Sequence, residues 1–251
     1  MRILLLDIET APNVAHVWGL WEQNVGLNQL LASGYVMCWA AKWHGEAEIM
    51  FDSIMRSKPK AMLARIHALL CEADVVVHYN GRKFDIPTLN KEFLTHGMTP
   101  PSPYKQIDLL QVVKRQFKFP SNKLAYVAPE LGLAPKEKHE GHEMWIKCMA
   151  KDPEAWVEME RYNKQDVGTL EELYDKLLPW IPNHPNRGLY EQVGAPQCPA
   201  CGSTDLQRRG TARNTAGVYG RFQCKGCGSW SREPTPQNDK ADRSILMRQA
   251  A

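Results

Sequence analysis

The sequence has no long hydrophobic run. No stretch approaches the roughly 18 consecutive apolar residues that a membrane-spanning helix needs. The short apolar segment 3–6 is followed by Asp7 and Glu9, where the hydrophobic part of a secretory signal would have to continue. We therefore expect a protein that is neither membrane-bound nor secreted, and that works in a bacterial or phage-infected cytoplasm or in another reducing compartment.

The sequence also lacks a strong net charge and an internal repeat. Its 31 Lys and Arg residues against 28 Asp and Glu residues give a formal net charge of only +3 at pH 7. This balance is too mild to indicate nucleic-acid binding from bulk charge, so any basic surface must be arranged locally. The hydrophobic share of 43% over 251 residues suffices for one medium-sized core with a small appendage, which excludes wholesale disorder.

The seven cysteines do not form the even set that a secreted disulfide framework needs. Cys38, Cys71 and Cys148 stand alone in hydrophobic sequence, where we expect packed thiols. The other four form two CxxC pairs, which need a separate explanation.

Hydrophobic periodicity predicts an α/β fold, a mixed sheet flanked by helices, because strands come first and then alternate with helices. Proline and glycine become frequent near residue 180, which indicates a linker. We predict a domain over 1–180, a linker over 181–196, a cysteine module over 197–232 and a flexible tail over 233–251. The expected strands are 3–6, 14–18, 35–43, 47–51, 75–77 and one ending near 107, and the expected helices are 59–72, 87–96, 124–131, 154–178 and one capped by Asp108.

Four acidic residues follow or lie on the predicted core elements. Asp7 and Glu9 come directly after a buried strand, and residues two apart on an extended chain point the same way. Asp85 follows another apolar strand, and Asp166 lies on the long helix with Tyr162 four residues before it, on the same face. Solvated acids at strand ends are the plain interpretation of Asp7 and Glu9 alone. When the four acidic residues are considered together, we expect their carboxylates to meet at one pocket.

Four carboxylates in one pocket repel each other unless cations neutralise them. Hard oxygen ligands of this kind suit Mg²⁺ or Mn²⁺. The chemistry that uses such a cluster is phosphodiester cleavage with two catalytic ions. The sequence therefore indicates a metal-dependent phosphodiester hydrolase.

Three segments, LDIET, NGRKFDIP and YNKQD, occur in this order and resemble the exonuclease motifs of the DEDD 3′–5′ exonuclease superfamily. The second segment and the YxxxD form of the third are similar to those of the proofreading domains of family B DNA polymerases. The other branch of the superfamily has a histidine five residues before the last aspartate; Arg161 stands there, so this chain resembles the tyrosine branch. The likeness covers about residues 1–180.

This resemblance implies an RNase H-like fold for the body of the protein. It implies that Asp7, Glu9, Asp85 and Asp166 bind two Mg²⁺ or Mn²⁺ ions and that Tyr162 orients the attacking water. A pKa near 10 makes a tyrosine a poor base, which favours positioning over proton abstraction. The resemblance also implies that Asn80 and Phe84 line the substrate cleft.

Several of these residues have structural alternatives. Asn80 with Gly81 also suits a turn, Phe84 suits a core, and Tyr162 suits packing on an amphipathic helix. Asp108 suits a helix cap, with an accessory role near the metal ions as the alternative. His139 and His142 form an HxxH pair in a charged, glycine-containing loop, and we expect them to be solvated rather than part of the site.

The cysteine module consists of CPAC at 198–201 and CKGC at 224–227. Two such pairs suit one tetrahedral, structural Zn²⁺ site of a zinc ribbon, with Cys198, Cys201, Cys224 and Cys227 as ligands. Disulfides and a redox CxxC are the weaker alternatives. A segment of this size has too little core to fold alone, so bound zinc would stabilise it.

Basic and aromatic residues alternate between and after the cysteine pairs. Guanidinium groups contact phosphates and aromatic rings stack on bases, so we expect the ribbon to bind single-stranded nucleic acid. Docking of replication or repair proteins is the alternative. The residues that we expect to contact nucleic acid are Arg208, Arg209, Arg221, Phe222 and Trp230.

The sequence as a whole predicts a stand-alone, metal-dependent 3′–5′ exonuclease with DNA favoured over RNA as its partner. An exoribonuclease or a structure-selective endonuclease is the alternative within the same fold. A catalytically silent module that binds nucleic acid or protein is the alternative of another class, and the complete set of acids disfavours it.

Overall fold

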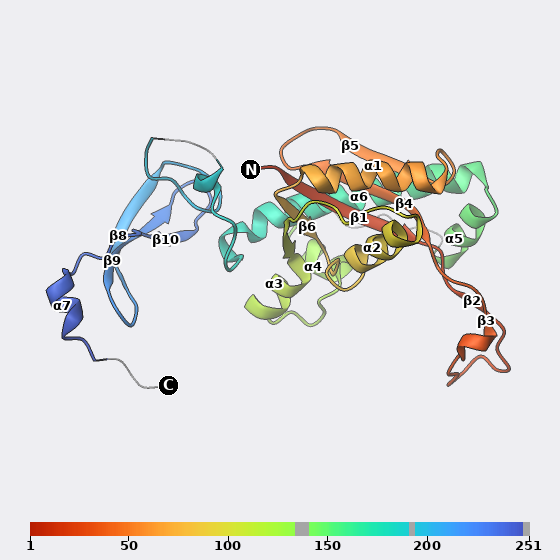
Figure 1. The fold of residues 1–251 in the computed structure, drawn as a ribbon, viewed down its shortest axis with the longest axis horizontal. Helices are drawn as coiled ribbons and strands as arrows, with labels where there is room; N and C mark the ends of the chain where they lie inside the picture. Colours follow the sequence, from red (N-terminus) through yellow and green to blue (C-terminus); the bar gives the residue numbers. More distant parts are fainter. Residues whose placement is uncertain (134–140, 191–193, 248–251) are drawn as a thin grey trace. The chain divides into compact units, whose positions relative to one another are not determined.

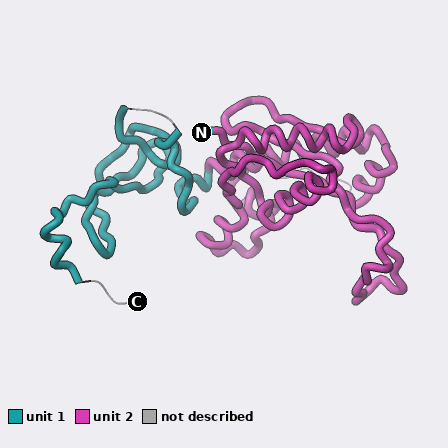
Figure 2. Tube along the Cα trace, viewed as in Figure 1, with its two compact units in different colours: residues 1, 176–251 teal, residues 2–175 magenta. Residues whose placement is uncertain are grey.

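The computed structural model describes residues 1–133, 141–190 and 194–247. These residues divide into two compact units, one of residues 2–175 and one of residue 1 with residues 176–251 (Figure 2). Within the described ranges, every helix is too short or too polar to cross a membrane.

A five-stranded mixed sheet forms the centre of the larger unit, with the strand order β5-β4-β1-β6-β7 (Figure 1). Strand β1 (Ile3–Thr10) pairs antiparallel with β4 (Val36–Trp43), which pairs antiparallel with β5 (Ile49–Ser53). On its other side β1 runs parallel to β6 (Val75–His78), which runs parallel to β7 (Lys105–Asp108). The predicted mixed α/β sheet is thus confirmed, and the carboxyl ends of β1, β6 and β7 lie at one edge.

Helices cover both faces of this sheet. Leu4, Leu6 and Ile8 of β1 pack with α1 (Pro59–Glu72) and α2 (Asp85–Thr95) in one buried cluster. Side chains alternate along a strand, so Asp7 and Glu9 point to the opposite face. That face is covered by the helices α5 (His142–Met149) and α6 (Pro153–Leu177), whose buried side chains form a second cluster with Met37 and Cys38 of β4.

Two shorter helices follow β7. Asp108 caps α3 (Leu109–Gln116) as predicted, with its side chain accepting a hydrogen bond from the Leu110 N–H at 3.1 Å. Helix α4 (Leu124–Glu130) ends before Gly132, whose φ of +72° ends the helical path.

The region after β1 differs from the prediction. The expected strand 14–18 is only the two-residue β2 (Val14–Ala15), which pairs with β3 (Leu30–Ala32), beside the short 3-10 turn η1 (Leu27–Gln29). Trp18 and Trp21 are 98% and 84% exposed, so their aromatic character does not reflect a buried strand. The segment 12–34, which contains β2, η1 and β3, forms an arm, and a hydrogen bond from the Ala11 N–H to the Tyr35 carbonyl closes its base.

Helix α5 was also absent from the sequence-based prediction, which expected a charged loop around His142. The helix buries Met144 and Cys148 against the face of the sheet that Asp7 and Glu9 share. His142 is its exposed first residue, as expected, whereas His139 lies outside the described residues.

The smaller unit contains a three-stranded antiparallel sheet of β8 (Leu206–Arg213), β9 (Val218–Cys224) and β10 (Trp230–Arg232). Two 3-10 turns precede it, η2 (Leu178–Trp180) and η3 (Arg187–Leu189), and the Arg187 N–H donates to the Pro199 carbonyl. The predicted flexible tail begins with a hydrogen-bonded segment. Glu233 and Gln237 donate main-chain hydrogen bonds to Gly220 and Val218, which hold that segment along β9, and α7 (Lys240–Ser244) follows.

Candidate functional site

The structure brings three of the predicted metal-binding acids together. One carboxylate oxygen from each of Asp7, Glu9 and Asp166 lies within 4.8 Å of the other two. Asp7 and Glu9 come from the end of β1, and Asp166 comes from α6 on the face that they share. We call these three residues the acidic cluster. Three oxygens at this spacing fit a hard divalent cation such as Mg²⁺ or Mn²⁺ and repel one another without one.

Asp85 is the fourth predicted acid, and it lies beside the cluster rather than within it. It is the first residue of α2, and its Oδ1 accepts a hydrogen bond at 3.2 Å from the Ile8 N–H, between Asp7 and Glu9. Only 3% of Asp85 is exposed. Burial is the main cause that raises the pKa of Asp85 to about 7, and the negative charge of Asp108 also raises it. The hydrogen bonds from the N–H groups of Ile8 and of Asp85 itself favour the ionised form and offset part of this rise.

Asn163 holds one member of the acidic cluster in place. Its Nδ2 donates to Asp7 Oδ2 at 2.7 Å, and its Oδ1 accepts from the Cys38 thiol at a sulfur–oxygen distance of 3.9 Å. Asn163 and Cys38 are both completely buried. Burial raises the pKa of the Cys38 thiol well above its ordinary value, and the charges of Glu9 and Asp7 add to this, so Cys38 stays protonated and able to donate.

The residues predicted to assist the acids differ in their surroundings. Tyr162 is half-buried and packs edge-on against Trp145 of α5, with 6.0 Å between ring centroids. Phe84 is 44% exposed, which excludes the core alternative, and lines a cavity of about 420 Å³ with Thr10 and Lys91. Asn80 has a φ of +69°, and its N–H donates to Asp108 Oδ1 at 2.9 Å.

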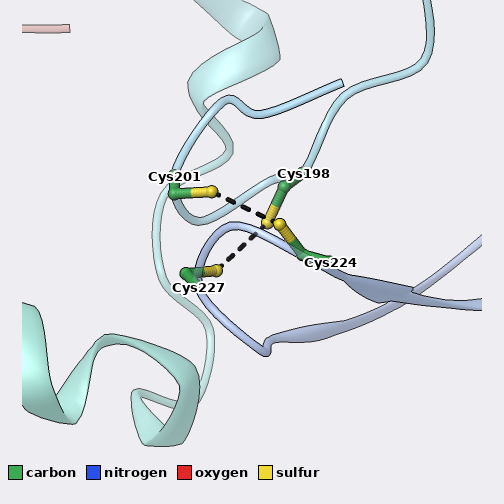
Figure 3. A group of neighbouring side chains, drawn as sticks. All are labelled: Cys198, Cys201, Cys224 and Cys227. Atoms are coloured by element: carbon green, nitrogen blue, oxygen red, sulfur yellow. Dashed lines mark hydrogen bonds between the residues drawn. The ribbon is translucent and has the colours of Figure 1, made fainter. Parts of the chain in front are cut away.

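The four cysteines of the two CxxC pairs converge as the sequence predicts. Figure 3 shows their side chains turned toward one another from two loops, and all four sulfurs lie within 4.8 Å. The Cys198–Cys227 and Cys201–Cys224 sulfur distances are 3.7 and 3.5 Å. Sulfurs on a tetrahedron with zinc–sulfur bonds of about 2.3 Å are about 3.8 Å apart, so the cluster fits one zinc ion.

The two loops that carry these cysteines have the same main-chain geometry. Gly202 and Gly228 donate to the carbonyls of Cys198 and Cys224, with φ of +80° and +82°, a conformation that suits glycine. Burial opposes ionisation of Cys224, but the N–H groups of Cys227 and Gly226 and the neighbouring thiols outweigh it and lower its pKa to about 7. The thiolate is the form that binds a metal, so Cys224 is the readily ionised ligand of the cluster. Burial raises the pKa of Cys198 and of Cys201, and a bound metal would have to displace their protons.

The five residues predicted to contact nucleic acid lie on both faces of the small sheet. Arg208 lies directly opposite Phe222, so these two share a face. Trp230 lies opposite Gln223, which places it on the other face with Arg221, and the Arg221 guanidinium stacks over its ring at 5.0 Å. The Arg209 side chain donates to Gln207, which also lies opposite Gln223. Arg209, Arg221 and Trp230 therefore share one face, which we call the arginine face, and Arg232, directly opposite Arg221, lies on it too.

Sequence reasoning missed Asn163 and Cys38. Asn163 lies three residues before Asp166 and thus on the same helix face, a spacing that was already visible in YNKQD. Cys38 had no local signal, because only the pairing of Glu9 with Cys38 between β1 and β4 brings it to the site.

The fold has counterparts among known proteins. The family B DNA polymerase from the hyperthermophilic archaeon Pyrobaculum calidifontis shares 19% sequence identity with this chain and superposes with a TM-score of 0.51. The match covers 71% of this chain but only 24% of the polymerase, so the chain spans about a quarter of that protein. No curated protein has a matching sequence.

The sequence of the larger unit also matches a protein-family model. The model of the RNase H superfamily matches residues 26–178, a range that includes Asp85, Tyr162 and Asp166 and begins after Asp7 and Glu9. It spans more than half of the chain, and the mixed sheet and flanking helices agree with it. The chain belongs to the RNase H superfamily.

Proposed function

We propose that this protein is a metal-dependent 3′–5′ exonuclease that hydrolyses the phosphodiester bonds of DNA from single-stranded or frayed 3′ ends. The observation that carries the proposal is the acidic cluster: three carboxylate oxygens within 4.8 Å, with Asp85 bonded to the main chain between two of them. DNA is favoured because the motifs and the fold resemble those of a DNA polymerase.

Each residue of the site would have a distinct role in the reaction. Two divalent ions bound at the acidic cluster and Asp85 would supply the positive charge that activates water and stabilises the leaving 3′ oxygen. Asn163 orients the Asp7 carboxylate, and Tyr162, one helical turn before Asp166, would orient the attacking water. Phe84 and Asn80 would contact the nucleotides next to the scissile bond.

The smaller unit would contribute a zinc ribbon that binds the nucleic acid. We retain residues 1–180 as the catalytic body, 181–196 as the linker and 197–232 as the ribbon. The boundary between the compact units falls at residues 175 and 176. Docking of replication or repair proteins on the ribbon is the competing role, and substitutions of the ribbon arginines and of Trp230 separate the two.

The test is cleavage of a 5′-labelled single-stranded oligonucleotide with Mg²⁺ or Mn²⁺, run beside an RNA of the same sequence. We expect a ladder that shortens from the 3′ end, faster on DNA. Asp7→Asn and Asp166→Asn should abolish it, while Asp175→Asn, an exposed carboxylate on the same helix, should not.

Three results would contradict the proposal. Cleavage of RNA alone would make the protein an exoribonuclease, and internal products from the first time point would make it an endonuclease. Binding without cleavage under either metal would leave a catalytically silent binding module.

A further inference from the structure

A pocket lies beside the turn that carries Asn80, apart from the acidic cluster. Its cavity volume is about 400 Å³. Tyr79 and Asn80 after β6, Lys114 on α3 and the segment 122–124 before and at the start of α4 line it. We call it the Asn122 pocket; of these lining residues, the proposed reaction has used Asn80 alone.

Asn122 lines the pocket, and its side-chain oxygen lacks a hydrogen-bond donor among the described residues. Its Oδ1 is shielded from solvent and accepts no hydrogen bond from the residues that the structure describes. The Tyr79 hydroxyl donates to the Asn122 main-chain carbonyl at 2.6 Å, which fixes the residue in place. Buried acceptors in folded proteins are normally paired, so a ligand that carries an N–H group and turns the Asn122 amide toward the pocket would satisfy this oxygen.

The surroundings of the pocket are basic. The segment 109–129 has no Asp or Glu, and its four cations are all exposed. The turn after Asn80 adds exposed Arg82 and Lys83. The acids nearest in sequence are Asp108, buried and bonded to the N–H groups of Asn80 and Leu110, and Glu130 at the end of α4. The cations are Lys114, Arg115, Lys118 and Lys123.

The pocket and the acidic cluster lie along the same sheet edge. Asn80 follows the carboxyl end of β6, and Asp108 ends β7, both strands being parallel to β1. Neighbouring strands are about 4.8 Å apart, so β7 is about 10 Å from β1. A strand whose 3′ end occupies the acidic cluster can therefore continue over this edge into the pocket.

We propose that the Asn122 pocket binds one nucleotide of the substrate strand, upstream of the 3′ end. The nucleobase donates an N–H to Asn122 Oδ1, and Lys114 and Lys123 bind the flanking phosphates. This inference rests on the proposed function, since it places the strand relative to the acidic cluster. It gives the body a nucleic-acid contact that does not depend on the ribbon.

Binding of a labelled 15-nucleotide DNA to the full chain in EDTA, followed by fluorescence anisotropy, tests the phosphate contacts without turnover. Lys114→Gln with Lys123→Gln should weaken binding about 10- to 30-fold at 0.1 M salt and reduce the slope of log K against log salt by about 1.4, for two phosphate contacts. Lys58→Gln with Lys60→Gln removes the same charge from exposed residues at the start of α1 and should change neither value.

A second variant tests the base contact. Asn122→Leu should weaken binding roughly three- to tenfold with an unchanged salt slope. On an abasic strand of the same length it should bind like the unmodified protein. In cleavage assays both variants should raise KM and leave kcat nearly unchanged.

The outcomes separate this inference from the proposed function. If the unmodified protein binds and cleaves DNA while the lysine pair behaves like the Lys58 and Lys60 control, the inference is wrong and the exonuclease proposal stands. If the unmodified protein binds DNA without cleaving it, and these variants weaken that binding, the inference about the pocket holds and the exonuclease proposal fails. If the unmodified protein neither binds nor cleaves, both fail.

Discussion

Asn163 donates a hydrogen bond to Asp7 across the interface between α6 and the central strand, with 2.7 Å between Nδ2 and Oδ2. The amide can face only one way, because its Oδ1 receives the Cys38 thiol. A metal-binding carboxylate held by a buried neutral donor keeps its orientation without losing its charge.

Asn163→Leu should therefore weaken metal binding more than it alters the fold. Loss of a partner that orients a metal ligand costs about 10- to 100-fold in metal affinity or activity. We expect the Mg²⁺ concentration for half-maximal cleavage to rise by at least tenfold, with most of kcat recovered at saturating Mn²⁺. Cys38→Ala keeps Asn163 and should shift the Mg²⁺ requirement less. An unchanged Mg²⁺ requirement in Asn163→Leu, with unchanged thermal stability, would contradict the positioning role.

The raised pKa of Asp85 gives the metal-free protein a stability that depends on pH. The pKa of Asp85 is about 7 in the folded protein and near 3.8 when unfolded, so between about pH 4 and 7 the folded state holds a proton that the unfolded state has lost. The free energy of unfolding should fall as the pH rises through this window, by on the order of 4 kcal/mol for this group.

Asp85→Asn removes the charge and keeps an oxygen for the Ile8 N–H. In EDTA we expect the variant to melt at a higher temperature than the unmodified protein at pH 8 and at a similar temperature at pH 4.5, and to be inactive with metal. Calorimetry at the two pH values measures the difference, with Asp175→Asn as the control for an exposed carboxylate. A lower melting temperature for Asp85→Asn at pH 8 would mean that the ionised carboxylate is stabilised in the folded state.

The sequence carried enough information to predict the acids and the cysteines, because their chemistry depends on short local patterns. Asp7 and Glu9 alternate with Ile8 on a strand, and each CxxC pair forms its own turn. The acids from distant segments meet only through the tertiary fold, an RNase H-like mixed sheet flanked by helices, which the motif resemblance implied and the structure confirms. Asp85 lies apart from the three-acid cluster because α2 begins at this residue and directs its carboxylate at the Ile8 N–H.

Other features depend on long-range packing and were not predictable in this way. Helix α5 is stabilised by burying Met144 and Cys148, a long-range contact that its eight-residue sequence does not reveal. The division of the ribbon arginines between two faces follows from alternation along β8 and β9, with Arg208 opposite Phe222 and Trp230 opposite Gln223. The pairing that sets this register, including its shift between Arg208 and Thr211, is a long-range property. Alternation along a strand predicts faces only where the register is regular.

Substitution of two different glycines by alanine should change the free energy of unfolding in opposite directions. A Cβ at Gly81 would lie 2.5 Å from the Cγ of His78, which is completely buried. Gly81→Ala should lower the free energy of unfolding by about 1–3 kcal/mol through overpacking. Gly168, inside α6, has only Ile49 Cδ1 at 4.0 Å, so Gly168→Ala should raise it by about 0.5–1 kcal/mol. Urea unfolding measures both, and equal effects would contradict the difference in packing.

Zinc should stabilise the smaller unit alone. We expect about one zinc ion per purified chain, and Cys198→Ser with Cys224→Ser should release it. Hydrogen exchange in β8 and β9 should then become fast, while exchange in β1 and β4 stays slow and the acidic cluster keeps its dependence on Mg²⁺. Cys71→Ser, a thiol outside the cluster, is the control. Full zinc retention in the double variant would show that the four sulfurs are not the ligands.

Arg208 and Arg209 are adjacent on β8, and alternation along the strand therefore places them on opposite faces of the ribbon. The face of Arg209 also carries Arg221 and Trp230, so it offers cations and an aromatic ring together. If nucleic acid binds this face, Arg209→Gln should weaken DNA binding and reduce the salt slope by about 0.7, while Arg208→Gln should change neither. Trp230→Ala should cost about 1–3 kcal/mol through lost base stacking, with the slope unchanged. Equal effects of the two arginine variants would mean that neither face is selective, and no effect of any variant would favour the ribbon as a protein-docking module.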